Sequence, residues 1–195
     1  MILLKKGQEI SIDDRMLTGF LVGFGWDVSH GRRFSFFRRA EEKVDCDASV
    51  ILCKNGSWNG DIEDIVYYAN LEHYSRGVIH MGDNITGEDG RDHEMVYVNL
   101  EKIPETVSRI VFTLNIYHAK DRGQDLGRLK KTYIRILDNN SGKEVCRYQP
   151  EGTNGRNTAL IIAELRRCQG DWIFCAVGEG TDDVSIAAMA KRLGQ

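Results

Sequence analysis

The sequence predicts an all-β fold, built as a sandwich or a barrel. Short runs rich in β-branched and aromatic residues recur along the 195 residues, and turn residues separate them. The chain holds 20 glycines and only two prolines, which is typical of strands joined by tight turns. Many short strands of even spacing indicate a two-layered or closed antiparallel fold.

Nine such runs are the expected strands. The run 95–100 alternates apolar and polar residues, which is the pattern of a strand with one buried face, whereas 109–117 is nearly continuous and indicates a buried strand. Turn sequences at 138–143 and 168–171 predict two hairpins. In chain order, the expected strands are 18–26, 48–53, 62–69, 95–100, 109–117, 131–137, 144–148, 158–167 and 172–177.

A short helix is expected at the C-terminus. Asp183 or Ser185 can cap its first turn, and the segment 186–193 is rich in residues that favour helices. Gly194 stands where such a helix ends. A second helical turn is expected within 100–107, before a strand.

The composition indicates a cytoplasmic globular protein. The formal net charge is −3, so nothing favours bulk attraction to nucleic acid. The five cysteines form no CxxC pair and match no zinc or haem spacing, which suits a reducing compartment. No signal peptide is expected at the N-terminus, and no apolar run approaches the ~18 residues of a membrane span. We expect one domain, 1–195, with a basic and aromatic loop inserted at about 29–43.

The densest chemical signal is the acidic segment 82–94. Its glycines allow a tight turn, and its oxygen donors suit a hard cation such as Ca²⁺. These donors are Asp83, Asn84, Thr86, Asp92 and Glu94. The spacing is not that of an EF-hand, because the sixth loop position is Glu88 rather than glycine and the flanks look like strands. A solvated acidic turn in a hairpin is the alternative, and the residues alone leave both open.

Three further aspartates stand at strand ends. Asp27 follows the strand 18–26, whereas Asp45 and Asp47 open the strand 48–53. A spacing of two places Asp45 and Asp47 on one face of a strand, where they can share a cation. The alternative is that they only cap the entrance of the strand. The nearby acidic segment favours the shared cation.

A set of short motifs runs in order from near residue 3 to about residue 180, and together they resemble the TerD family. The motifs are Gly23-x-Gly-Trp-Asp27, Asp45-x-Asp-Ala-Ser49, His80-x-Gly-Asp-Asn-x-Thr-Gly87, Arg122-Gly-Gln-Asp-Leu-Gly127, Tyr133-Ile-Arg135, Cys146-Arg-Tyr148 and Trp172-x-Phe-x-Ala-Val-Gly178. No single motif is specific, but the combination is, and it covers nearly the whole chain.

The resemblance implies a β-sandwich of two sheets with small helices, and two neighbouring Ca²⁺ ions bound in loops at one end. It implies bacterial operons for resistance to tellurite, phage and other stresses. Partners are then expected among other tellurite-resistance proteins, including a membrane protein of the TerC type that would bring the chain to the inner membrane surface. The implied calcium ligands are Asp27, Asp45, Asp47, Asp83, Asn84, Thr86, Asp92 and Glu94, with a backbone oxygen near Gly87.

Two features depart from the family pattern. The family usually continues as Gly-Asp-Asp-Glu where this chain has Arg91-Asp92-His93-Glu94, so a histidine replaces one carboxylate. That change would weaken one site or make its affinity depend on pH. The segment 29–39 interleaves arginines with phenylalanines, as in insertions of the longer TerX and TerZ members. It predicts a docking surface for an acidic partner, an anionic membrane or nucleic acid, and the alternative is packing on the sandwich edge.

We expect a binding module rather than an enzyme. The chain has no nucleophile elbow, no HExxH and no phosphate-binding glycine loop. A zinc site at His80, His93 and Asp83 is conceivable, but zinc prefers nitrogen and sulfur ligands, and the segment offers oxygen. The remaining alternative is a Mg²⁺-dependent hydrolase or phosphoryl-handling enzyme that uses the acidic cluster.

Overall fold

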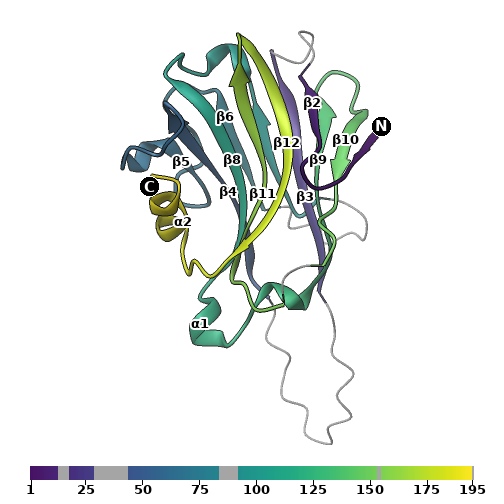
Figure 1. The fold of residues 1–195 in the computed structure, drawn as a ribbon, viewed down its shortest axis with the longest axis vertical. Helices are drawn as coiled ribbons and strands as arrows, with labels where there is room; N and C mark the ends of the chain where they lie inside the picture. The colour runs from purple at the N-terminus through teal and green to yellow at the C-terminus, as the bar shows by residue number, and fades with distance from the viewer. Residues whose placement is uncertain (13–17, 29–43, 84–91, 153–154, 195) are drawn as a thin grey trace, which may run out of the picture.

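Two six-stranded sheets face each other in the computed structural model, which describes the chain except residues 13–17, 29–43, 84–91, 153–154 and 195 (Figure 1). The predicted sandwich is therefore confirmed. The first sheet has the order β1 (Ile2–Leu4), β10 (Glu144–Tyr148), β9 (Leu129–Asp138), β3 (Phe20–Val28), β7 (Glu94–Val98), β6 (Val78–Asp83). The second has the order β2 (Glu9–Ser11), β12 (Asp171–Thr181), β11 (Ala159–Cys168), β8 (Val107–Ile116), β4 (Cys46–Lys54), β5 (Ile65–Val66).

The core lies between the sheets and follows from the alternation of side chains along each strand. In β3, Phe20, Val22 and Phe24 are fully buried because every second residue of a strand points to the same face. The Phe112 ring on β8 lies 6.2 Å from the Phe24 ring and 6.4 Å from the Phe174 ring, so aromatic contacts join the two sheets. Burying one such side chain contributes roughly 1.5–3 kcal/mol.

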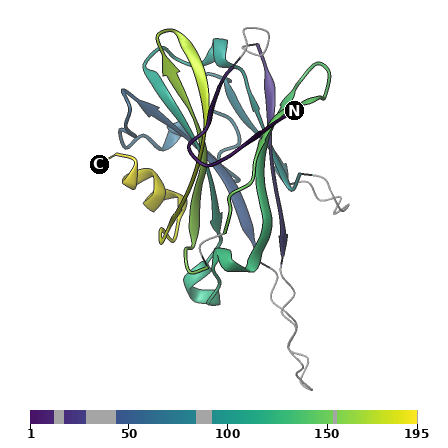
Figure 2. The ribbon, with the colours of Figure 1, turned by 45° about the vertical axis from the view of Figure 1, so that its right-hand side comes forward.

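The C-terminal helix α2 (Ile186–Arg192) packs on the outer face of the second sheet (Figure 2). Met189 and Ala190 of α2 are buried with Ile51 and Val111 of the sheet. Ser185 is the cap, because its side chain accepts a hydrogen bond from the Ala188 amide at 3.2 Å. Of the residues described, no helix is long and apolar enough to cross a membrane.

Most of the expected strands are present, and the segment 62–69 is the main correction. It was expected as one strand, but it begins with a 3-10 helix, Ile62–Asp64, and only Ile65–Val66 pairs with β4. The Asp61 side chain accepts from the Glu63 amide at 3.0 Å, which starts a helical turn instead. Short edge strands β1 and β2 and the helix α1 (Ala119–Arg122) were not predicted. The turn expected within 100–107 is a 3-10 helix, Leu100–Lys102.

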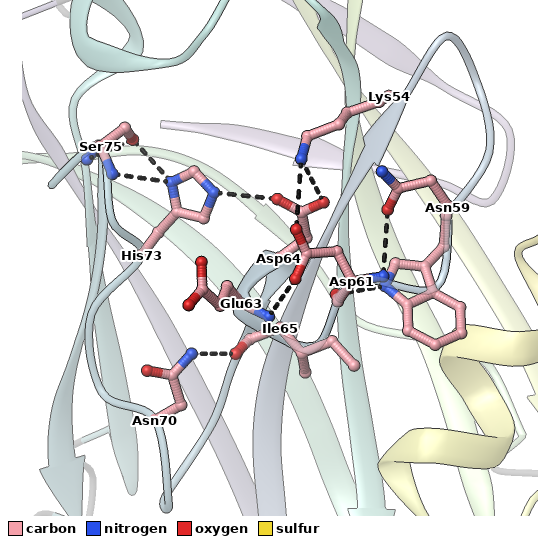
Figure 3. A network of polar contacts seen from close by, with 11 residues as sticks. Lys54, Asn59, Asp61, Glu63, Asp64, Ile65, Asn70, His73 and Ser75 are labelled. Atoms are coloured by element: carbon pink, nitrogen blue, oxygen red, sulfur yellow. Dashed lines mark hydrogen bonds and ion pairs between the residues drawn. The ribbon is translucent and has the colours of Figure 1, made fainter.

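A buried polar network fastens the segment after β4 to the second sheet (Figure 3). Lys54 Nζ lies 2.8 Å from Asp64 Oδ2, and His73 Nε2 lies 3.3 Å from Asp64 Oδ1. The side chains of Asp64 and His73 are fully buried, so this carboxylate depends on both partners. Lys54 comes from β4, whereas Asp64 and His73 come from the segment that follows it.

The hydrogen bonds around His73 fix which ring nitrogen carries the proton. The Ser75 amide donates to Nδ1 at 3.3 Å, and the Ser75 Oγ lies 2.7 Å from the same nitrogen. Nδ1 is therefore an acceptor, and Nε2–H donates to Asp64. Burial lowers the pKa of His73, although the Asp64 carboxylate opposes that effect.

Acid is expected to weaken the fold through His73. Because burial lowers its pKa in the folded state, the folded ring binds a proton more weakly than the unfolded ring, whose pKa is about 6.5. This contribution is complete above pH ~6.5 and is lost as the pH falls from there towards the lower folded-state pKa. Urea denaturation at pH 7.5 and pH 5.5 is expected to show the loss in the native chain.

The His73→Gln variant tests whether His73 causes this loss of stability at low pH. At pH 7.5 it is expected to be less stable than the native chain by about 1–3 kcal/mol, because glutamine keeps a donor for Asp64 but has no counterpart of the Nδ1 that accepts from the Ser75 amide. Between pH 7.5 and pH 5.5 it should lose less stability than the native chain does. His118→Gln is the control, since the His118 side chain is 51% exposed. An identical pH dependence in the native chain and in His73→Gln would contradict this assignment.

Candidate metal centre

The β6–β7 hairpin positions the acidic segment. Asp83 ends β6, Glu94 begins β7, and the two are paired across the ladder. Strands therefore flank the segment, as predicted, rather than the helices of an EF-hand. The predicted ligands Asn84, Thr86 and Gly87 lie outside the described residues, and of Asp83 only the backbone is described.

Glu94 points into the sandwich and links the two sheets. It is only 4% exposed, and its Oε2 accepts hydrogen bonds from the Ala48 amide at 2.8 Å and from His80 Nε2 at 3.0 Å. The Gly82 amide donates to His80 Nδ1 at 3.0 Å, so Nε2 is the nitrogen that carries the proton. Both contacts fall on Oε2, and among the described residues no donor is hydrogen-bonded to Oε1.

Asp47 and Asp45 lie at the start of β4 but have different surroundings. Asp47 precedes Ala48, the residue whose amide binds Glu94, and it pairs with Asn115 across the β4–β8 ladder. Asp45 precedes the strand, and Arg122 Nη1 of α1 lies 3.6 Å from its Oδ2. Asp47 is the chain neighbour of Ala48, but its side chain points to the other face of β4, as that of Asn115 does on β8, whereas the Asp45 carboxylate faces a guanidinium.

Asp27 lies at the exposed end of β3. Its Oδ2 is 2.9 Å from Lys131 Nζ, and its side chain is 56% exposed. The β3–β9 register shifts between Gly25 and Asp27, so the strand ends irregularly there. The hydrogen bond to Asp27 raises the pKa of Lys131, which stays a cation beside the carboxylate.

Asp92 is held by Arg135 and Tyr133. The Arg135 Nε donates to Asp92 Oδ1 at 2.9 Å, and Nη2 donates to Oδ2 at 2.8 Å, so the two groups form a bidentate pair. The Tyr133 hydroxyl donates to Oδ1 at 2.9 Å. Burial, together with the nearby Asp92 charge, raises the pKa of Tyr133 to about 12, which keeps the hydroxyl protonated as a donor.

The two glycines of the Gly23-x-Gly motif form the floor beneath these side chains. Gly23 pairs with Arg135 and Gly25 pairs with Tyr133 across the β3–β9 ladder. A Cβ atom at Gly23 would overlap the Asp92 carboxylate, and one at Gly25 would overlap the Tyr133 ring. The motif thus leaves room for side chains of neighbouring strands and is not a nucleotide loop.

The predicted ligands do not form one cluster among the described residues. Asp47 is one residue from the amide that binds Glu94 but on the opposite face of β4, whereas Asp27, Asp45 and Asp92 each face a basic side chain. Where the chain is described, no group of three or more His, Cys, Asp and Glu residues could hold a metal ion. Any complete site would therefore need donors outside the described residues, where the predicted ligands Asn84, Thr86 and Gly87 lie.

Sequence reasoning missed His80 and Arg135 as partners of these carboxylates. The signal for His80 was present, because it occupies the same inward register as Val78 in β6 and a buried histidine needs a polar partner. Arg135 carried no comparable local signal, because it is 43 residues from Asp92 in the chain.

Replacing Gly23 by alanine is expected to break the Asp92–Arg135 pair. The new methyl group would displace the carboxylate and leave buried charge less well paired, which costs about 1–3 kcal/mol of unfolding free energy. The Gly155→Ala variant is the control, since its Cβ would meet nothing within 4 Å. Urea denaturation of both variants measures the difference, and equal midpoints would show that the pair tolerates the methyl group.

Comparisons of the chain with known protein families and known proteins agree with this fold. The TerD domain family model matches residues 1–193. The chain is 36% identical to stress response protein SCP2 of Bacillus subtilis (strain 168), with 98% of each chain covered. It is 34% identical to the tellurium resistance protein TerD of Serratia marcescens, with 92% of this chain and 90% of that protein covered.

A solved structure shows the same fold at low sequence identity. A homologue of telluride resistance protein (TerD) from Streptomyces coelicolor A3(2) has a TM-score of 0.66 and 16% identity, with 91% of this chain and 98% of that chain covered. The family model spans nearly the whole chain, and each of the two relatives is identical to this chain at more than a third of the aligned residues. The chain therefore belongs to the TerD domain family, a family of tellurium resistance and stress response proteins.

Proposed function

We propose that this protein is a calcium-binding stress-response module that acts by calcium-dependent binding of a partner, and that it is not an enzyme. The observation that carries the proposal is the Glu94 carboxylate, which is 4% exposed and joins the acidic hairpin to the strand of Asp47. A buried carboxylate in a hairpin that carries further carboxylates favours a cation. Family membership supports the setting of stress response.

The donor chemistry fits Ca²⁺ better than other metals. Glu94 and Asp47 offer carboxylate oxygens, and the predicted donors Asp83, Asn84, Thr86 and the backbone near Gly87 offer oxygen as well. Ca²⁺ takes six to eight such ligands, whereas Mg²⁺ keeps several waters and zinc prefers nitrogen and sulfur. Both ring nitrogens of His80 are already occupied by the Gly82 amide and by Glu94, so His80 is not offered to zinc.

A second calcium ion would draw on Asp27, Asp45 and Asp92. Each of these carboxylates faces a basic side chain, namely Lys131, Arg122 or Arg135. Ligation would require these cations to move away, and Arg135 is held in addition by Glu144 at 3.0 Å. We therefore propose that the ion at Glu94 and the acidic hairpin binds more tightly than the second one.

The carboxylates convert metal binding into a change at one end of the molecule. Without a cation, the Glu94 charge and the acidic segment repel each other. Bound calcium supplies the positive charge that removes this repulsion. Glu94 then holds β7 to β4 through the Ala48 amide, so the hairpin is fastened to the second sheet.

The proposed partners are other tellurite-resistance proteins, including a membrane protein of the TerC type. The basic and aromatic segment 29–43 is the proposed contact, and it lies outside the described residues. It joins β3, which ends beside Asp27, to β4, which carries Asp47. The segment thus lies in the chain between the proposed ligands Asp27 and Asp47. We therefore propose that calcium binding changes the affinity of this segment for the partner.

Calcium is expected to raise the melting temperature, and Glu94→Gln should remove most of that rise. Ligand binding to the folded state alone adds about 2.7 kcal/mol when free Ca²⁺ exceeds Kd 100-fold. Glutamine keeps an acceptor for the Ala48 amide but loses the charge that a cation needs. Calorimetric titration and thermal unfolding with Ca²⁺, Mg²⁺ and Zn²⁺ measure both effects.

The matched control is Glu164→Gln on β11. Glu164 is a half-buried carboxylate that pairs with Arg109 at 2.6 Å, so its loss should lower stability but leave the calcium response unchanged. An unchanged calcium response in Glu94→Gln would refute the assignment of Glu94. A response to Mg²⁺ as large as that to Ca²⁺ would instead favour the hydrolase alternative.

A further inference from the structure

The strand β9 contains a β-bulge opposite Asp27, where it lies beside β3 (Figure 1). Gly25 pairs with Tyr133 and Asp27 pairs with Lys130, so β9 has one residue more than β3 between these two pairs. Lys130 and Lys131 are both exposed, although successive side chains of a regular strand point to opposite faces. The extra residue therefore turns Lys131 to the solvent side of the sheet.

The backbone of Lys131 has a left-handed conformation that favours glycine. Its φ is +49°, a region that residues with a Cβ atom adopt only at a cost in conformational energy. Bulges with a left-handed residue usually have glycine there. The path of the strand alone would be better served by glycine, so the lysine side chain is the feature that needs an explanation.

The bulge directs the Lys131 ammonium group to the Asp27 carboxylate. Nζ of Lys131 lies 2.9 Å from Oδ2 of Asp27, and this is the only ion pair of Lys131 among the described residues. Lys130 stands directly opposite Asp27 in the ladder, yet it forms no ion pair in the part of the chain that the structure describes. The bulged lysine, and not the directly paired one, therefore neutralises this carboxylate.

Lys131 is the most easily displaced of the three cations that face predicted ligands. Its side chain is 77% exposed and is held by one carboxylate. The Arg135 side chain is 20% exposed and bonds two carboxylates, and the Arg122 guanidinium also lies over the Tyr117 ring at 5.6 Å. A flexible, solvated ammonium group can leave its partner at little cost, whereas a bidentate guanidinium cannot.

We propose that Lys131 is a resident cation that occupies the Asp27 carboxylate, and that a second calcium ion binds by displacing it. The inference rests on the proposed calcium function and names the residue that limits the affinity of the second ion. The ammonium group competes with Ca²⁺ for the same oxygen, and it repels a bound Ca²⁺ for as long as it stays nearby. The protein therefore takes up its two ions in separate ranges of calcium concentration, and the ion at Glu94 binds first.

The test is calorimetric titration of the metal-free full chain with Ca²⁺. Lys131→Gln removes the charge and should raise the affinity of the weaker ion by about two- to fivefold, which is the range that an exposed ion pair allows. Lys131→Gly should raise it by the same factor, because it lacks the ammonium group as well. The tighter ion should bind to both variants as it binds to the native chain.

Two other lysines serve as matched controls for the loss of one positive charge. Lys130→Gln changes the neighbouring residue, which faces Asp27 without an ion pair among the described residues, so its effect on the weaker ion should be smaller than that of Lys131→Gln. Lys143→Gln changes an exposed lysine in the turn at the other end of β9 and should leave both affinities unchanged.

Thermal unfolding of the metal-free variants is a second readout, and it does not involve calcium. Lys131→Gly and Lys131→Gln both lose the ion pair, but only glycine adopts the positive φ without strain. Lys131→Gly should therefore have the higher melting temperature of the two. A lower melting temperature would contradict the conformational cost from which the role of Lys131 is inferred.

The titrations separate a failure of this inference from a failure of the proposed function. If the tighter ion binds but the weaker one has the same affinity in the native chain and in Lys131→Gln, Lys131 is not a competitor and the calcium function still stands. A single bound ion in every protein would overturn the inference in the same way. Equal gains in Lys130→Gln and Lys131→Gln would show a general effect of charge rather than a resident cation. No calcium binding in any protein would refute the proposed function itself.

Discussion

The bond between the Ala48 amide and the Glu94 carboxylate is the contact on which the candidate metal centre depends. A carboxylate this deeply buried is stable only with hydrogen-bond donors around it, and here one donor is the backbone of the opposite sheet. The contact therefore fixes where the acidic hairpin lies relative to β4. Asp47 is the residue before Ala48, so its side chain points to the opposite face of β4.

On the outer face of the first sheet, two glycines determine where several large side chains lie. Gly23 and Gly25 leave space over β3, and the Asp92 carboxylate and the Tyr133 ring fill it. Arg135 then bonds both Asp92 and Glu144, and the Arg147 guanidinium lies over the Tyr133 ring at 4.2 Å. The Gly23-x-Gly motif is thus explained by packing between neighbouring strands and not by phosphate binding.

The Ser75–His73–Asp64 network has the connectivity of a hydrolase triad but is built for stability. Lys54 lies 2.8 Å from Asp64, so the carboxylate is already neutralised and supports an imidazolium less well. The His73 ring is fully buried, and its Nδ1 also accepts from the Ser75 amide. These contacts tie a segment with little strand structure to the edge of the second sheet.

Most strands of the core, the C-terminal helix and the family could be predicted from the sequence, because alternation, turn residues and motif order are local properties of the chain. The prediction was wrong at 62–69, where the Asp61 side chain competes with strand pairing. The sequence predicts Asp92 and Glu94 together as ligands, but in the folded chain Asp92 faces Arg135 and Glu94 faces the Ala48 amide. Those partners lie 43 and 46 residues away, and no local pattern encodes which buried charge a distant strand will meet.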